Sequence, residues 1–143
     1  MNYIIDEDKI YLSIDKGEEV NASLLMVCEE NDIFFGWING IGAIDNPELG
    51  YYDIKSKDYI KKTFKGDFEI VSLIGNMTFK DGQRFIHTHL LFTDEKFNAY
   101  GGHLFECRIS AAGEFIIFMG NNRIDRKYNN KVGLALWDCK IDK

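Results

Sequence analysis

The chain has 143 residues, a formal net charge of -6 and a hydrophobic fraction of 45%, with a sequence pI near 5.0. This length and hydrophobic content predict one folded domain over residues 1–143 and exclude intrinsic disorder. No apolar run approaches the roughly 18–20 residues of a membrane helix, so no membrane partner is expected. The acidic balance argues against a protein that binds nucleic acid through phosphate contacts.

The cellular compartment is indicated by the N-terminus and the cysteines. The first residues lack the basic and apolar segments of a signal peptide, and the three cysteines (Cys28, Cys107 and Cys139) form no Cys-x-x-Cys pair. These features predict a cytoplasmic protein with buried, reduced thiols. Lysines cluster between residues 55 and 65 but are interleaved with acidic residues, which is typical of a solvated surface.

The first elements in chain order are a short strand over residues 9–14 and one amphipathic helix over about residues 18–30. Asp15 and Glu18 have the spacing of a capping box with Asp15 as the cap. Apolar side chains then recur at helical spacing until Asn31, namely Val20, Leu24, Val27 and Cys28. The helix is therefore expected to pack one face onto the core.

After residue 33 the helical period is replaced by strand patterns. Gly40 and Gly42 resemble the start of a dinucleotide-binding motif, but Asp45 replaces its third glycine and no helix follows, which excludes that site. Strands are expected over residues 33–44, 49–54, 68–79, 84–93, 97–108, 114–119 and 133–137. One helix and about seven strands predict an α+β fold, a single compact domain with a mainly antiparallel β-sheet packed by one principal helix.

A turn at residues 81–82 (Asp-Gly) sets the register of two neighbouring strands. This dipeptide closes two-residue hairpins, and the resulting register places Asn76 opposite His87 and Ile74 opposite His89. Side chains alternate along a strand, so both histidines are expected on one face of the sheet.

A second turn brings in the third histidine. Residues 94–96 predict a three-residue turn that pairs Thr93 with Phe97 and places His103 opposite His87. Directly opposed residues share a face, so three imidazoles are expected in one patch. A slip of one residue, or a bulge at the preceding glycine pair, would send His103 to the other face.

Three clustered histidines predict a metal site formed by His87, His89 and His103, with an uncoordinated surface cluster as the alternative. Neutral imidazole is the commonest metal ligand, and three histidines with an open fourth position are typical of zinc, although iron, nickel, copper and manganese also bind histidine. Asn76 is a candidate for orienting a ligand or, equally, a structural residue. Cys107 lies about 13 Å along the strand from His103, too far for the same ion.

A His-x-His pair in a β-rich chain also occurs in cupins. Their first motif has a glutamate three or four residues after the second histidine, whereas Glu95 here follows five intervening residues. Their second motif needs a late proline-glycine-histidine pattern, and Pro47 is the sole proline. The sequence therefore disfavours a cupin.

Short segments in a fixed order carry a broader resemblance: Gly-Glu-Glu at 17–19, Gly-Ile-Gly-Ala at 40–43, Leu-Gly-Tyr-Tyr-Asp at 49–53, Gly-Asp-Phe-Glu-Ile-Val-Ser-Leu at 66–73, Gly-Asn at 75–76, Asp-Gly at 81–82, His-Thr-His at 87–89 and Gly-Gly-His at 101–103. Together they resemble the plants-and-prokaryotes-conserved (PPC) domain over about 120 residues. The resemblance implies a compact α+β fold that assembles as a homotrimer. It also implies a metal site in prokaryotic members, here His87, His89 and His103, and a DNA-binding label.

Two departures from the plant members bear on DNA. Those members have Gly-Arg-Phe-Glu-Ile where this chain has Asp67 in place of the arginine, and the chain has no Arg-Gly-Arg-Pro hook. Both differences, with the acidic charge, disfavour direct DNA binding although the family label includes it.

Two functions follow from these features. The first is a cytoplasmic, homotrimeric metal-binding protein with a binding or regulatory role. The alternative is a metal-dependent enzyme that acts on a small molecule at an open three-histidine site. The alternative lacks an identified general base. Glu69 is expected on the opposite face, and so is Glu106 unless a bulge at residues 101–102 reverses it. The carboxylates of the 94–96 turn would reach the histidines only if that turn folds over them. The 35–43 stretch, with Trp37, and the Tyr51-Tyr52 pair are candidates for a trimer contact or, equally, for ordinary core packing.

Overall fold

The computed structural model describes residues 1–139, which form one helix and nine strands. The elements are β1 (Asn2–Asp6), β2 (Lys9–Asp15), α1 (Val20–Glu30), β3 (Phe35–Asp53), β4 (Asp58–Thr63), β5 (Asp67–Lys80), β6 (Gln83–Thr93), β7 (Ala99–Gly120), β8 (Asp125–Asn129) and β9 (Leu134–Trp137). The predicted α+β class is confirmed. No helix among the described residues has the length and apolar character needed to span a bilayer.

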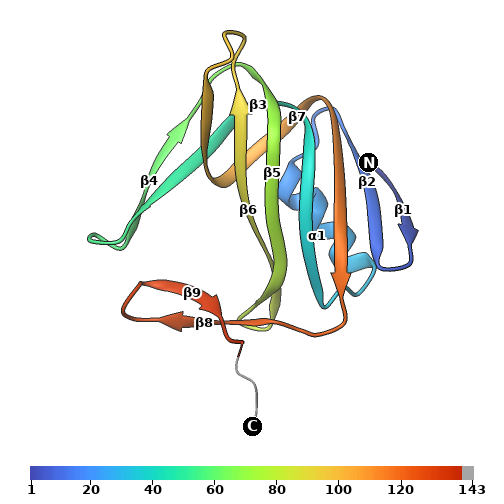
Figure 1. Ribbon diagram of the computed structural model, residues 1–143, viewed down its shortest axis with the longest axis vertical. Helices are drawn as coiled ribbons and strands as arrows, with labels where there is room; N and C mark the ends of the chain where they lie inside the picture. Colours follow the sequence, from blue (N-terminus) through green and yellow to red (C-terminus); the bar gives the residue numbers. More distant parts are fainter. Residues whose placement is uncertain (140–143) are drawn as a thin grey trace.

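The strands form one sheet in which four members close into a ring (Figure 1). The order is β1-β2-β7-β3-β5-β8-β9, with β4 paired to β3. Strand β6 pairs with both β5 and β7, β7 pairs with β3, and β3 pairs with β5, so β3, β5, β6 and β7 form a closed circuit. The pairing of β5 with β8 is parallel, and the other pairings between named strands of the described chain are antiparallel.

Strands β3 and β7 each span two segments that the sequence patterns separate. Segments 33–44 and 49–54 belong to the 19-residue β3, and segments 97–108 and 114–119 belong to the 22-residue β7. Their mutual register shifts at three places, so the strands bend without ending. One bend requires Gly42, whose φ is +149° and whose hypothetical Cβ would lie 2.4 Å from the Ala112 carbonyl oxygen. The prediction of separate strands is therefore wrong.

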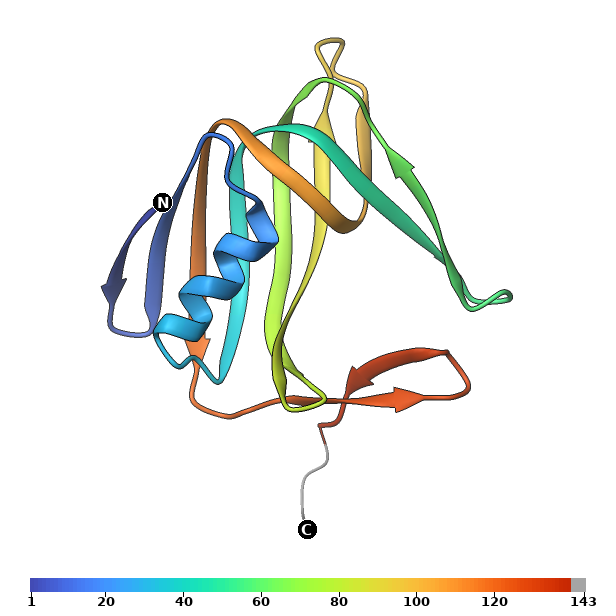
Figure 2. The ribbon, with the colours of Figure 1, turned by 180° about the vertical axis from the view of Figure 1, so that it is seen from behind.

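Helix α1 begins two residues later than predicted, and its cap is Glu19 rather than Asp15. The Glu19 carboxylate accepts a hydrogen bond from the Ala22 amide. The Glu18 carboxylate accepts from the Asp15 amide at 2.8 Å and stabilises the turn before the helix. The four predicted apolar residues of the helix are fully buried, and α1 lies across one face of the sheet (Figure 2).

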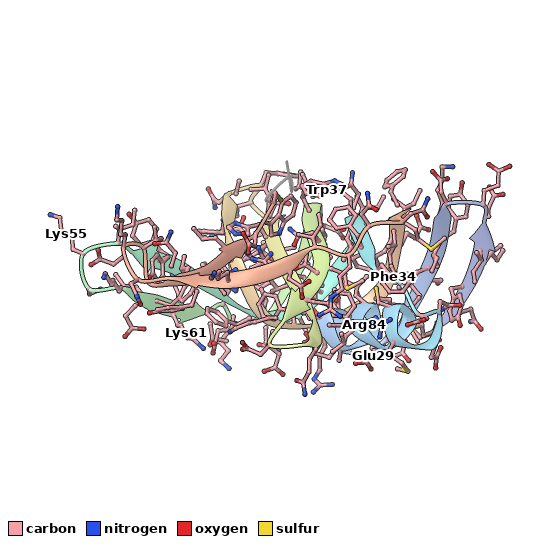
Figure 3. All side chains as sticks on the ribbon, turned by 90° about the horizontal axis from the view of Figure 1, so that it is seen from below. Glu29, Phe34, Trp37, Lys55, Lys61 and Arg84 are labelled. Carbon is pink, nitrogen blue, oxygen red and sulfur yellow. The ribbon has the colours of Figure 1, made fainter. Side chains whose placement is uncertain are left out.

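The opposite face of the sheet carries exposed apolar side chains. In Figure 3, Trp37 projects on the side away from Glu29 of the helix. Cross-strand partners share a face, and the register connects this surface to the histidines through Asn39, Ile74 and His89. We call it the helix-distal face, defined by Tyr11, Trp37, Ile74, Leu91 and Phe118, each 38% to 45% exposed.

Two of the three cysteines are buried as predicted. Cys28, on the buried face of α1, and Cys107, on β7, lie in the same core, whereas Cys139 is exposed, so the prediction is wrong for that residue.

Candidate metal centre

The β5–β6 hairpin has the predicted register. Asp81 and Gly82 both have positive φ angles, +52° and +81°, as a tight hairpin turn with two left-handed residues requires. Asn76 consequently lies opposite His87, and Ile74 lies opposite His89.

The β6–β7 turn is longer than predicted: it spans five residues, 94–98, rather than three, and the Asp94 side chain closes it. Its carboxylate accepts hydrogen bonds from the backbone and side-chain nitrogens of Asn98, and Phe97 adopts a left-handed φ of +62°. Thr93 therefore pairs with Ala99 instead of Phe97. Sequence spacing alone does not reveal this turn, since a side chain closes it.

This longer turn shifts the register by two residues and moves His103 opposite His89 instead of His87. The predicted pairing is wrong, but an even shift leaves every side chain on its original face. Residues 101 and 102 stay in register with β6, so they form no bulge against that strand. His103 therefore joins the other two histidines.

The three imidazoles converge on one point. Each of His87, His89 and His103 offers a ring nitrogen, and these nitrogens all lie within 4.8 Å of one another. The ring centroids are 5.1 to 5.5 Å apart. A tetrahedral zinc ion with bonds of about 2.0–2.1 Å separates its nitrogen ligands by about 3.3 Å. Modest ring rotations would therefore bring the set around one ion.

The electrostatic environment keeps the cluster neutral. Burial, with the nearby Arg126 and the other imidazoles, lowers the pKa of His87 to about 4. Burial, with His89, Lys61 and Arg126, lowers the pKa of His103 to about 4. Burial also lowers the pKa of His89. Neutral imidazoles at pH 7 present the lone pairs that a metal needs.

One nitrogen of the cluster has no hydrogen-bond partner. His103 Nδ1 is buried and unpaired within the described chain. A buried polar atom without a partner costs free energy, which a metal bond or a bound ligand would offset. This orphaned nitrogen and the three-imidazole donor set fit a transition metal such as zinc.

Aromatic rings close the site on the side of β4. The rings of Tyr59 and Phe105 lie 5.0 and 4.9 Å from that of His103. They approach because Gly50, the β3 partner of His103, has no side chain. A Cβ at Gly50 would lie 2.4 Å from the Phe105 ring and 2.8 Å from the Tyr59 ring. Burial raises the pKa of Tyr59, so its hydroxyl stays protonated at neutral pH.

Arg126, from β8, reaches the cluster although no motif or spacing in the sequence points to it. Its Nη2 donates to Asn76 Oδ1 at 2.8 Å and lies 3.3 Å from His87 Nδ1. Its Nε donates to Thr78 Oγ1 at 2.7 Å, and its Nη1 donates to the Ala135 carbonyl oxygen at 3.0 Å. Asn76, the predicted orienting residue, thus contacts His87 through Arg126. Burial lowers the pKa of the guanidinium.

A cavity of about 380 Å³ adjoins two of the histidines. Its basic members are Lys80 and Arg126 together with the two imidazoles, and no carboxylate of the described residues 1–139 lines it. The full lining is Asn21, Tyr59, Lys80, Phe85, Ile86, His87, His103, Leu104, Phe105, Arg126 and Leu134–Leu136.

Solved structures with the same fold resemble this chain over nearly its whole length. A protein of Bacteroides thetaiotaomicron described as a putative DNA-binding protein is 35% identical, with a TM-score of 0.92 and 96% of each chain covered. A plant- and prokaryote-conserved protein of Pyrococcus horikoshii is 34% identical, with a TM-score of 0.85 and coverage of 96% of this chain and 94% of that one. A metal-containing protein of Archaeoglobus fulgidus is 32% identical, with a TM-score of 0.85 and coverage of 95% and 96%.

Functionally curated proteins give no match to the chain. The family model of the Plants and Prokaryotes Conserved domain, however, matches residues 6–120. That range contains all three histidines and every segment of the resemblance described above, so this chain belongs to the Plants and Prokaryotes Conserved domain family.

Proposed function

We propose that this protein is a cytoplasmic, homotrimeric metal-binding protein with a binding or regulatory role. In this proposal, His87, His89 and His103 hold a divalent transition metal, with zinc as the leading candidate. The observation that carries this proposal is the convergence of three neutral imidazoles within 4.8 Å. The buried, unpaired His103 Nδ1 supports it. The description of the Archaeoglobus fulgidus relative as metal-containing also supports it.

The helix-distal face supports the homotrimer. Its exposed aromatic and aliphatic side chains adjoin a groove of about 680 Å³ that includes Tyr11, Ile41 and Ile116. Large apolar patches on a folded chain are typical of interaction surfaces. The groove is lined by residues of β1, β2, β3, β5 and β7 and includes part of the 35–43 segment, for which the sequence leaves a subunit contact and ordinary core packing equally open.

Charge argues against direct DNA binding. The net charge is -6. The paired end of β3 and β4, residues 48–63, forms the β3–β4 arm. Its lysines, two of which Figure 3 labels, are partly engaged within the chain. Lys61 pairs with Glu48 at 2.9 Å, and Lys57 donates to the Asn130 carbonyl oxygen. Any role of this chain in DNA binding, which the description of the relatives suggests, is therefore indirect.

Elemental analysis of protein purified without chelator tests the proposal. We expect close to one equivalent of transition metal per chain, and a His87→Ala variant should lose it. The exposed Lys127→Ala variant controls for purification. Only trace metal in the wild-type protein, with no uptake of added zinc, would contradict the site.

A second function, a metal-dependent enzyme acting on a small molecule, is favoured by the cavity beside His87 and His103. A metal bound there would supply Lewis-acid chemistry. The protonated Tyr59 hydroxyl is a proton donor at its wall, whereas the described part of the chain contributes no carboxylate base to the cavity lining. Retention of the trimer in His87→Ala would favour a functional site, and its loss would favour a structural ion.

A further inference from the structure

The C-terminal hairpin, formed by β8 and β9, completes the cavity beside the histidines. It follows the family-matched residues 6–120, yet it contributes Arg126 and residues 134–136 to the lining. The hairpin joins the ring through two parallel pairs, Phe79 with Asp125 and Lys80 with Arg126. Figures 1 and 2 show it on the same side of the molecule as the β3–β4 arm.

The charge balance of the cavity is one-sided. Arg126 is half-buried, and all of its hydrogen-bond partners in the described chain are neutral. Lys80 adds a second positive charge, and no aspartate or glutamate among residues 1–139 lines the cavity. Three neutral imidazoles leave the full charge of a divalent ion uncompensated. Metal and guanidinium would therefore repel each other unless an anion lies between them.

The N–H groups of Arg126 that lack a partner mark where such an anion would bind. A guanidinium has five N–H groups. Three of them are used by Thr78, Ala135 and Asn76. One N–H remains on Nη1 and one on Nη2, and the latter points to His87 Nδ1 at 3.3 Å.

Metal binding removes the partner of this Nη2 group. An arginine can only donate, so the contact requires an unprotonated His87 Nδ1. If the metal binds Nδ1, it occupies the accepting lone pair. If the metal binds Nε2, the neutral ring carries its proton on Nδ1 and two donors face each other. In either case the metal-loaded site leaves one free N–H on each terminal nitrogen of Arg126.

We infer that the histidine cavity takes a small organic carboxylate, whose oxygens bind the two free N–H groups of Arg126 beside the metal. Two donors on neighbouring nitrogens match the two oxygens of a carboxylate. The walls formed by Phe105, Leu134 and Leu136 suit an apolar body. The inference rests on the proposed metal site and names its ligand class. Bound metal should raise the affinity for the carboxylate, and bound carboxylate should raise the affinity for the metal by the same factor.

The test measures the affinity of the protein for cobalt(II), by its visible absorption, with and without saturating acetate. We expect acetate to tighten cobalt binding by about tenfold or more, as a charge-assisted interaction implies, and neutral acetamide to leave it unchanged. Arg126→Met should abolish the acetate effect, and Arg126→Lys should retain part of it. Lys127→Met removes a charge from the adjacent position of the same strand and should behave as wild type.

The outcomes separate the two proposals. Cobalt binding that acetate does not tighten, or tightens equally in Arg126→Met, overturns the carboxylate site and leaves the metal site standing. A larger effect of inorganic phosphate than of acetate also overturns it. Failure of the wild-type protein to bind cobalt or zinc overturns the proposed function itself, and the carboxylate site with it. Should Arg126→Met fail to fold by circular dichroism, the acetate and acetamide results on the wild type and Arg126→Lys decide.

Discussion

Arg126 Nη2 donates a hydrogen bond to Asn76 Oδ1 over 2.8 Å and so joins the C-terminal hairpin to the strand opposite His87. Asn76 is 8% exposed, and the neighbouring acceptor Thr78 is fully buried. The guanidinium is therefore held by two buried side chains of β5. This connection makes a segment outside the family-matched range part of the histidine site.

Asn76→Ala should destabilise the protein, because it leaves an Arg126 N–H without its acceptor in a half-buried position. We expect a loss of about 1–3 kcal/mol in the free energy of unfolding, measured with urea. Ser72→Ala, on the same strand and away from Arg126, is the control and should change stability by less than about 0.5 kcal/mol. Equal effects of the two substitutions would show that the Asn76–Arg126 bond contributes nothing.

The metal-free protein should lose stability as the pH falls from 6.5 to about 4. His87 and His103 have pKa values of about 4 in the folded state, against an ordinary value of 6.5. Unfolding therefore takes up protons in this window. The stability that the two neutral imidazoles contribute is fully present above pH 6.5 and is lost as the pH falls towards 4. Denaturation with urea at several pH values measures the slope. A His87→Asn, His103→Asn variant should show a shallower slope, and an identical slope would contradict the assignment.

Zinc should stabilise the folded chain by mass action. A free zinc concentration of 100 times the dissociation constant adds about 2.7 kcal/mol to the free energy of unfolding. Thermal denaturation should show an upward shift with zinc that a chelator reverses. His103→Ala removes a ligand and should abolish the shift. An unchanged melting temperature in the wild type would count against binding to the native state.

Ile74→Asp should dissociate the proposed homotrimer, because it places a charge in the helix-distal face. Met26→Asp is a matched control on the helix, since Ile74 is 45% exposed and Met26 is 43% exposed. Analytical ultracentrifugation should give a trimer mass for the wild type and the control, and a smaller mass for Ile74→Asp. Dissociation by Met26→Asp alone would assign the contact to the helix side.

The pure protein should not retard a random DNA duplex at near-physiological salt. Its net charge of -6 opposes phosphate contacts, and salt weakens the remaining attraction steeply. Electrophoretic mobility measured across salt concentrations checks this. Retention that falls with a steep slope in log salt would establish direct binding and reverse the conclusion drawn from charge.

Much of this architecture could be predicted from local patterns. The helix follows from apolar spacing, and the β5–β6 register follows from the Asp81-Gly82 turn, since both signals lie within a few residues. The shared face of the histidines survived an error in the β6–β7 turn because that error was an even number of residues. The prediction that the three histidines share a face depends only on whether the register error is even or odd, not on the exact pairing.

The parts that could not be predicted depend on contacts distant in sequence. Strand β1 is mostly exposed, so it shows no apolar alternation, and β8 has five residues, of which three are exposed. Arg126 enters the site through a parallel pairing with β5 and through side chains about 50 positions earlier. No local pattern encodes such an approach.

The pair formed by His89 and His103 also marks the fork at which β6 and β7 separate. Their ladder runs from this pair to Thr93 and Ala99, and beyond it β7 continues against β3, where Leu104 pairs with Leu49. An ion held by both histidines would cross-link the two strands where the closed circuit can begin to open. Its expected kinetic signature is a slower unfolding rate, and the folding rate would stay nearly unchanged if this junction forms after the folding transition state.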